Sequence, residues 1–560
     1  MDLYPRPIAA VVQRALRTSP VVIVEGPRGV GKTTLSKQFG LTYRSLLDVA
    51  TREAATSSPR DWVEALPVGS VIDEAQLLGG ASLEIKRIVD ERGGVPGQFV
   101  LTGSARLRRN ELGGSDPLVG RTRNIELLPL TQCEIERSPR DVITGLFDEE
   151  PTTWTLESGE RQQETLSRIV KSGIPALRTD DLIEQTQRQR DYVEGLFLGD
   201  VYQAGNRRTG IVRLFRHLAT VSGAVSDLTK YGRAIDMSHT TVGDYLDALD
   251  AVFLTWKVPA WHSAASGRGT RKDRVFLADP SFAASALGIA VDRSIGPHEG
   301  KLFETFVACE LRALLGWSTT AGTKMFHWRK DDNNEVDLVL EAPDGRLVGI
   351  EVKSAREHKD AHFKGLRAFR SAHSDRFHRG FVMQPCDHPF RSSDGLWAIP
   401  LEALWRVGEV VAATSAISSF DAALADARRT LQATLSPNEV LASVTSALAE
   451  ASTRLEAIGN LFAEHNLEAT VSGHRVSAPL PPSQEAVGVV RLAVKSPYGA
   501  RYQLDLSATG GSRGVVTWTV GVGDGRDSTG LDLDELLARR IADIPTEVWR
   551  LHGSTPPPNT

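Results

Sequence analysis

The stretch VEGPRGVGKTTL at residues 24–35 has the residue types and spacing of a phosphate-binding loop. The glycines allow the backbone to curl so that successive N–H groups face a phosphate, and the helix that follows adds its partial positive charge. In such a loop the lysine reaches the β- and γ-phosphates and the threonine hydroxyl coordinates Mg²⁺. The complete motif between an apolar strand and a helix favours a site for ATP and Mg²⁺ over a simple glycine turn. The predicted nucleotide-binding residues are Gly26, Pro27, Arg28, Gly29, Val30, Gly31, Lys32, Thr33 and Thr34.

Two adjacent carboxylates, Asp73 and Glu74, end a short apolar strand that begins at Ser70. An aspartate at a strand end suits a magnesium contact, so Asp73 is predicted to hold the metal together with Thr33. Glu74 is placed to activate the attacking water as a general base. Isolated Asp-Glu pairs are common on protein surfaces, but a pair that follows a phosphate loop is typical of a hydrolytic site.

Two further residues are candidates for sensing or stabilising the transferred phosphoryl group. Ser104 follows a third apolar strand at 98–101, at the edge where ligands sit in open α/β folds. It would contact the γ-phosphate or, alternatively, only cap a helix. Arg121 precedes a strand-like TRNIELLPL and would stabilise phosphoryl charge, in its own or a neighbouring subunit. The alternative for Arg121 is an ordinary surface arginine.

A second group of acidic residues lies near the end of the recognisable domains. Asp337 and Glu351 are 14 residues apart, on two strands that an APDG turn joins, and Lys353 shares the face of Glu351. With Glu304 on the preceding helix, these carboxylates and the Val352 carbonyl would form an oxygen site for Mg²⁺, and Lys353 would orient water or stabilise charge. The alternative is an ordinary alternating charge pair on an exposed strand.

The order of these parts resembles a large prokaryotic family of AAA-type ATPases whose C-terminal region contains winged-helix and PD-(D/E)XK nuclease-like segments. The segments that carry the resemblance are GPRGVGKTT, VIDEAQLL, VLTGSARL and LVGR, followed by the C-terminal carboxylates, and it covers about residues 5–405. The resemblance implies ATP binding by an AAA-like core. It also matches the nuclease-like pattern at Glu304, Asp337, Glu351 and Lys353.

Residues 211–256 predict three short amphipathic helices and an apolar strand, the pattern of a winged helix-turn-helix. Its third helix, capped by Ser238, would present His239, Thr240, Thr241 and Asp244 to a major groove. This face carries an acid and no arginine, so base readout is weak, and a pure packing role is the alternative. Better candidates for phosphate contacts lie in the GRGTRKDR loop: Arg268, Arg271, Lys272 and Arg274.

Composition limits the classes of partner and location. A formal charge of −5 gives no global basic surface, so DNA contact requires a local patch. Cys133, Cys309 and Cys386 are far apart and lack metal-ligand spacing, which predicts a reducing compartment without disulfides or zinc. Because no long apolar window and no signal-peptide core are found, we expect a cytoplasmic protein without a membrane partner.

The 560 residues predict a multidomain α/β protein. Alanine- and leucine-rich segments from 410 to 468 predict two or three amphipathic helices, and alternating segments after the linker at 477–484 predict β-structure. The expected parts are a P-loop AAA-like parallel-sheet core at 1–130, a helical connector at 131–210, a winged helix-turn-helix at 211–295, a PD-(D/E)XK nuclease-like domain at 296–405, a helical segment at 406–475, a small β-rich domain at 485–550 with a terminal helix at 531–544, and a disordered tail at 551–560.

Two functions remain open from the sequence. In the first, a Mg²⁺-dependent ATPase drives or gates a DNA-cleaving C-terminal module. In the second, an ATP-switched binding or regulatory protein uses a non-catalytic nuclease-like fold as a platform for DNA, a protein partner or a second copy of the chain. A small-molecule kinase is disfavoured because Asp73, Glu74 and Ser104 match an ATPase layout.

Overall fold

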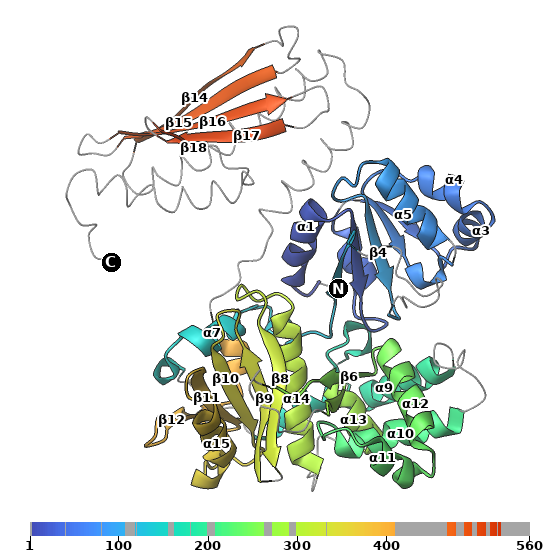
Figure 1. Ribbon diagram of the computed structural model, residues 1–560, viewed down its shortest axis with the longest axis vertical. Coiled ribbons are helices and arrows are strands. Elements are labelled where there is room, and N and C mark those ends of the chain that lie inside the picture. Colours follow the sequence, from blue (N-terminus) through green and yellow to red (C-terminus); the bar gives the residue numbers. More distant parts are fainter. Residues whose placement is uncertain are drawn as a thin grey trace. The chain divides into compact units, whose positions relative to one another are not determined.

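The computed structural model divides the chain into two compact units, Met1–Ser419 and Phe420–Thr560. In the first unit it describes residues 3–39, 41–79, 81–106, 118, 120–154, 162–179, 181–198, 208–262, 272–289, 298–331 and 333–408. In the second it describes residues 468–477, 486–495, 501–510, 516–522 and 525–527. Figure 1 shows the elements of both units, coloured along the sequence.

The N-terminal part of the first unit is a five-stranded parallel sheet in the order β2-β3-β4-β1-β5. β1, β3 and β4 are buried along their whole length, because helices cover both faces, as Figure 1 shows in blue. The strands are β1 (Val21–Glu25), β2 (Thr42–Ser45), β3 (Ser70–Asp73), β4 (Phe99–Gly103) and β5 (Thr122–Glu126). The helices are α1 (Ile8–Thr18), α2 (Lys32–Lys37), α3 (Val49–Ser57), α4 (Pro59–Glu64), η1 (Ala75–Leu77) and α5 (Ala81–Glu91).

Alternating residues of β1 serve two different cores. Val22 and Val24 join the large core that extends into the following segments, whereas Val21 and Ile23 pack with α4 and α5. Since parallel strands all end at the same edge, Glu25, Asp73, Gly103 and Glu126 mark one carboxyl edge of the sheet. This edge is where a ligand of an open α/β sheet binds.

A helical segment follows the sheet and packs around the loops at its carboxyl edge. Ser172 and Gly173 donate hydrogen bonds to the buried Asp279, at 2.8 and 2.9 Å, which fixes the turn between α8 and α9. The elements of this segment are α6 (Gln132–Ile135), α7 (Val142–Asp148), η3 (Pro151–Thr153), α8 (Gln162–Val170), η4 (Pro175–Leu177) and α9 (Leu182–Leu198).

The described residues of the middle segment form three helices, a two-stranded antiparallel sheet and a fourth helix after the sheet. Ser238 caps the third helix by accepting a hydrogen bond from the Thr241 N–H, as expected. The elements are α10 (Arg208–Val221), α11 (Leu228–Ile235), α12 (His239–Ala251), β6 (Thr255–Val258), β7 (Arg274–Leu277) and α13 (Pro280–Ala286).

The C-terminal domain of the first unit is a mixed six-stranded sheet in the order β12-β13-β11-β10-β9-β8. β9 and β10 pair antiparallel, so the predicted hairpin that carries Asp337 and Glu351 is confirmed. The elements are α14 (Glu299–Leu315), β8 (Lys324–Asp331), β9 (Asn334–Glu341), β10 (Leu347–Val352), η7 (Asp360–Phe363), α15 (Lys364–Ala372), β11 (Phe377–Gln384), β12 (Phe390–Arg391), β13 (Trp397–Pro400) and α16 (Ala403–Arg406).

The second unit contains an antiparallel sheet in the order β14-β15-β16-β17-β18. Strand β14 corrects the sequence analysis, which assigned residues up to 475 to a helical segment. The stretch EATVSGHRVS is strand because β15 supplies its hydrogen bonds, and local helical spacing cannot compete with that pairing. Other predictions lie outside the described residues: the helices at 410–467 and 531–544 and the tail. The strands are β14 (Glu468–Ser477), β15 (Ala486–Lys495), β16 (Arg501–Gly510), β17 (Val516–Val522) and β18 (Gly525–Asp527).

Candidate functional site

The phosphate loop joins β1 to α2 in the conformation that the motif requires. Gly29 and Gly31 have φ values of 75° and 104°, which only glycine adopts at little cost. A Cβ atom on Gly26 would lie 2.1 Å from the Leu127 carbonyl oxygen, so this position has no room for a side chain. Among the predicted loop residues, Pro27 and Val30 are buried beneath the loop, whereas Arg28 and Thr34 are exposed.

Lys32 lies inside the loop rather than in solvent. Its Nζ donates hydrogen bonds to the carbonyl oxygens of Gly26 and Pro27, both at 2.8 Å. Burial lowers the pKa of Lys32 to about 8, although the negative charges of Glu74 and Asp73 act in the opposite direction. Neutral carbonyl oxygens therefore hold the Lys32 ammonium group at the loop. The negatively charged oxygens of a bound phosphate would take their place as acceptors.

Asp73, at the end of β3, accepts hydrogen bonds from hydroxyl groups on three other elements. The Thr33 Oγ1 donates to its Oδ2 at 3.0 Å, Tyr43 donates to the same oxygen, and Thr102 donates to Oδ1. Burial and the hydrogen bond to Asp73 raise the pKa of Tyr43 to about 12, so this donor stays protonated. A hydroxyl and a carboxylate side by side at the phosphate loop are the ligands that Mg²⁺ takes in such sites. The residues present therefore fit the metal.

Glu74 has a left-handed backbone conformation, with φ 59° and ψ 46°. This conformation is uncommon for a residue with a side chain and concentrates at functional sites. The Ser104 Oγ donates to Glu74 Oε2 at 3.0 Å, and the Gln76 side-chain amide donates to the same oxygen and, at 3.2 Å, to the Ser104 hydroxyl. The sequence analysis did not predict a role for Gln76. Its position two residues after Glu74, in VIDEAQLL, was the signal that could have identified it.

Arg121 lies at the opposite edge of the sheet from the phosphate loop. Its carbonyl oxygen accepts from the N–H of Val21, the first residue of β1, and its Nε lies 2.6 Å from Asp90 Oδ1. The expectation that Arg121 serves the phosphate loop of its own chain is therefore wrong, because β1 separates the two edges. A contact from a neighbouring subunit stays a prediction.

A charge cluster at the carboxyl edge connects the sheet to the later segments, and sequence analysis did not find it. Arg106, two residues after Ser104, pairs with Glu126 at 2.6 Å and with Asp250 of α12 at 3.2 Å. Glu126 also pairs with Arg312 of α14 at 2.6 Å. The partners are 20 to 186 residues apart, so no local motif signals them.

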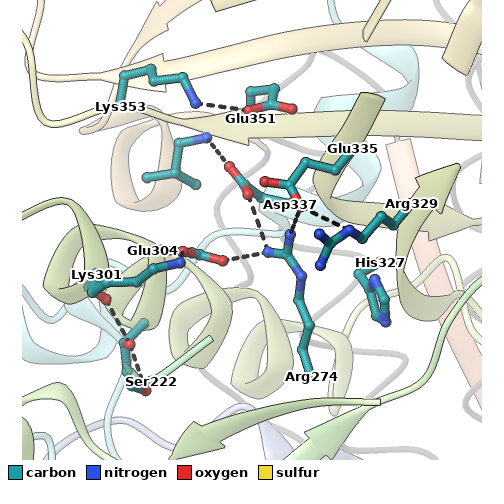
Figure 2. A network of polar contacts seen from close by, with 12 residues as sticks. Ser222, Arg274, Lys301, Glu304, His327, Arg329, Glu335, Asp337, Glu351 and Lys353 are labelled. Atoms are coloured by element: carbon teal, nitrogen blue, oxygen red, sulfur yellow. Dashed lines mark hydrogen bonds and ion pairs between the residues drawn. The ribbon is translucent and has the colours of Figure 1, made fainter. Parts of the chain in front are cut away.

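The C-terminal carboxylates surround one arginine (Figure 2). The Arg274 Nη1 donates to Glu304 Oε1 and, at 3.1 Å, to Asp337 Oδ1, while Nη2 donates to Glu335 Oε2 at 3.1 Å. The Arg274 side chain is only 3% exposed. Its proposed contact with a nucleic-acid phosphate is therefore wrong, because the guanidinium is enclosed by carboxylates of α14 and β9.

Basic groups also contact the remaining carboxylate oxygens. Lys301 Nζ lies 2.6 Å from Glu304 Oε2, and Lys353 Nζ lies 2.9 Å from Glu351 Oε2. Burial would raise the pKa of Asp337, but Arg274, Lys353 and the hydrogen bond from the Val352 N–H lower it to about 2. Burial and the nearby Asp337 raise the pKa of Glu351. The structure thus brings Glu304, Asp337, Glu351 and Lys353 together, but around protein cations.

Three protein-family profiles match the chain. Residues 18–136 match the family described as "AAA domain". The N-terminal sheet is an AAA domain. Residues 162–293 and 299–404 match two families that are each described as a domain of unknown function.

Curated relatives align with most of the chain. Two uncharacterized proteins, from Mycobacterium bovis and Mycobacterium tuberculosis, are each 28% identical over 421 residues, covering 73% of this chain and 86% of the relative. Among solved structures, two of the Thermotoga maritima RuvB protein, one of them titled a Holliday junction branch migration motor, each align with 45% of this chain and 87% of theirs. Both are 18% identical, and their TM-scores are 0.23 and 0.20. TM-scores this low establish no shared fold.

The C-terminal cluster does not fit a divalent metal ion in this arrangement. Among the described residues, no group of three or more histidine, cysteine, aspartate or glutamate side chains is arranged to hold one. The oxygens that would serve as ligands accept from Arg274, Lys301, Lys353 and the Val352 N–H instead. No chemical step through a metal at this cluster follows from the structure.

The predicted nucleic-acid contacts are divided between exposed and undescribed positions. On α12, His239, Thr240 and Asp244 are exposed and Thr241 is half-buried. Lys272 is exposed and lies 3.7 Å from an Asp227 carboxylate oxygen, whereas Arg268 and Arg271 lie outside the described residues. None of the helices that the structure describes is long and apolar enough to cross a membrane.

Proposed function

We propose that the chain is a Mg²⁺-dependent ATPase whose AAA domain switches the segments that follow it. The observation that carries this proposal is the set of side chains at the carboxyl edge of the sheet: Lys32, Thr33, Asp73, Glu74 and Ser104. These are the side-chain types that nucleoside triphosphate hydrolysis uses, and their proximity supports the proposal.

Each side chain has a distinct role in this proposal. Lys32 leaves the carbonyl oxygens of the loop and binds the β- and γ-phosphates, where its charged form is favoured. Thr33 and Asp73 hold Mg²⁺, which neutralises phosphate charge when bound. Glu74 orients the attacking water and accepts its proton. Ser104 and Gln76 hold the Glu74 carboxylate in position through hydrogen bonds to Oε2.

The route from hydrolysis to the rest of the chain starts at Arg106. This residue follows Ser104 by two positions, its N–H donates to the Ala251 carbonyl at the end of α12, and its guanidinium pairs with Glu126. Glu126 in turn pairs with Arg312 on α14. A shift of the Ser104 segment on nucleotide binding would therefore act on both the middle segment and the C-terminal domain.

For the domains beyond the AAA domain, a binding role is favoured over cleavage. We assign residues 211–295 to a winged helix-turn-helix and residues 296–405 to a PD-(D/E)XK nuclease-like fold, since three helices precede a two-stranded sheet and the Asp337 hairpin lies beside α14. The arginine-filled carboxylate cluster supports a non-catalytic platform. Its partner would be DNA through α12, another protein or a second copy of the chain.

The test is ATP turnover by the purified chain. Wild type, Lys32→Ala and Glu74→Gln are compared with Mg²⁺ and with excess EDTA, and ATP binding is measured in parallel. Hydrolysis that requires Mg²⁺ and Glu74, with ATP binding retained in Glu74→Gln, supports the proposal. Absence of Mg²⁺-dependent ATP binding to the folded wild type would sink it. Plasmid incubation in the same buffers detects cleavage, whose dependence on Asp337 would contradict the platform role.

A further inference from the structure

The cation at the C-terminal carboxylate cluster comes from a different segment of the chain. Arg274 is the first residue of β7 in the middle segment, whereas Glu304 lies on α14 and Asp337 on β9. Figure 2 shows the arginine side chain reaching from below into the group of carboxylates. Its Nη1 contacts both Glu304 and Asp337, so two carboxylate oxygens converge on one nitrogen.

The cluster contains as many basic groups as carboxylates. Its four carboxylates belong to Glu304, Glu335, Asp337 and Glu351, and its four basic groups belong to Arg274, Lys301, Arg329 and Lys353. A divalent cation added to this buried group would meet a guanidinium in the same position and be repelled by it. Arg274 thus supplies the positive charge that the convergent oxygens of Glu304 and Asp337 require.

Close packing leaves little space around the carboxylates. A Cβ atom on Gly223 would lie 2.9 Å from Glu304 Oε1, and one on Gly365 would lie 2.6 Å from Glu351 Oε1. Because Gly223 and Gly365 have no Cβ atom, their backbone can lie close to the Glu304 and Glu351 carboxylates. The Arg274 side chain itself is only 3% exposed, so the point between Glu304 and Asp337 is enclosed.

Backbone hydrogen bonds hold Arg274 where it is. It pairs with Val258 across the β6–β7 sheet and bridges to Val225. On the facing strand β8, the His327 ring Nε2 bonds the Lys272 carbonyl at 3.0 Å, and the His327 N–H donates to the Pro259 carbonyl at 3.0 Å. The backbone of Arg274 is thus held by strand pairing, and its side chain is only 3% exposed.

We propose that Arg274 is the resident cation of this cluster: it excludes divalent metal ions from the C-terminal domain and ties the middle segment to that domain. Removing the guanidinium leaves the Glu304 and Asp337 oxygens facing one vacated position, which is a site for a hard, oxygen-seeking divalent cation such as Mn²⁺. This inference does not depend on ATP hydrolysis.

The proposal is tested by measuring Mn²⁺ binding to the full-length chain without nucleotide. All variants carry the background substitution Asp73→Asn, which removes the proposed metal ligand of the AAA domain. With Arg274 present, we expect that any saturable Mn²⁺ binding is unaffected by Asp337→Asn. In Arg274→Met we expect one new site, at least about tenfold tighter than any binding by the background chain, and Asp337→Asn should remove it. Arg274→Lys, which keeps a positive charge, is the matched control and should still exclude Mn²⁺.

Two results would overturn the proposal. One is Asp337-dependent Mn²⁺ binding while Arg274 is present. The other is a folded Arg274→Met chain that gains no site. If Arg274→Met alone does not fold, the double variant Arg274→Met with Glu335→Gln removes one charge of each sign and retains both convergent oxygens. The first result is measured on chains that retain Arg274, so it does not depend on whether the Arg274 variants fold.

Discussion

In the part of the chain that the structure describes, two groups of carboxylates lie near a lysine, and they differ in which groups donate hydrogen bonds to them. In the AAA domain, Asp73 and Glu74 accept hydrogen bonds from neutral hydroxyl and amide groups. In the C-terminal domain, Glu304, Asp337 and Glu351 contact a guanidinium and two ammonium groups. We therefore expect the first group to accept a metal ion, whereas protein cations already contact the second.

This difference teaches that a carboxylate-lysine pattern does not by itself define a metal site. Both patterns are complete in the sequence, with every expected residue type present. We infer that metal binding depends on whether a protein cation occupies the point on which the carboxylate oxygens converge. A neutral hydrogen-bond donor does not supply the positive charge that would replace a metal ion. Four sets of substitutions test that comparison, beginning with the largest effect.

Exchanging one glutamate at each site should separate their functions. We expect Glu74→Gln to lower the rate of ATP hydrolysis about 10²- to 10⁴-fold, because it removes the general base. Glu351→Gln should leave hydrolysis within about twofold of wild type, since its carboxylate pairs with Lys353 in another domain. Steady-state phosphate release measures both. Equal losses in the two variants would mean that the C-terminal cluster takes part in the reaction.

Removing the central cation should destabilise the C-terminal cluster. Arg274→Met leaves carboxylates buried without their partner, which costs about 3–5 kcal/mol of unfolding free energy. Adding Glu304→Gln to Arg274→Met should recover part of this loss, because one unpaired charge disappears. Urea unfolding followed by tryptophan fluorescence provides the measurement. A loss below about 1 kcal/mol in the single variant would show that Arg274 is not holding the cluster.

Mild acid should weaken the contact between β8 and the middle segment through His327. Burial, and then the positive charge of Arg274, lower the pKa of His327 to about 4, and its Nδ1 has no hydrogen-bond partner among the described residues. Between pH 6.5 and 4 the unfolded chain binds the proton more strongly, so stability falls as pH falls through this window and levels off below it.

We expect His327 to account for about 2–3 kcal/mol of this loss. His327→Gln keeps a donor for the Lys272 carbonyl but does not titrate, so the same acid titration should be flatter by that amount. Urea unfolding at pH 7 and pH 4.5 in both proteins is the comparison. Identical pH dependence in the two would contradict the assignment.

The smallest effect concerns the Ser104 hydroxyl, which donates a hydrogen bond to Glu74. Ser104→Ala removes one hydrogen bond to Glu74 Oε2, which is worth about 1 kcal/mol, so the rate of hydrolysis should fall about 3- to 10-fold. Ser82→Ala is the matched control, because this exposed hydroxyl donates to the nearby Gly79 carbonyl and does not contact Glu74. A rate unchanged in Ser104→Ala would mean that Gln76 alone positions Glu74.

The local part of the fold was predictable from the sequence. The phosphate loop, β1, the strand that ends at Asp73 and the β9–β10 hairpin each depend on residues within about 15 positions of one another. Arg106, Gln76 and the Arg274 contacts were missed or misassigned. The basic loop GRGTRKDR contains four cationic residues, and nothing local distinguishes the one that becomes buried.

The amino-acid sequence was sufficient to predict a phosphate loop with Lys32 and Thr33, a following Asp-Glu pair, and a second set of carboxylates beside Lys353. The folded chain was needed to show that Arg121 lies at the edge of the sheet away from the phosphate loop and that Arg274 contacts the second set of carboxylates. The reason is physical: a motif specifies neighbours along the chain, whereas the partners of Arg274 are 30 and 63 residues away and meet it only through folding.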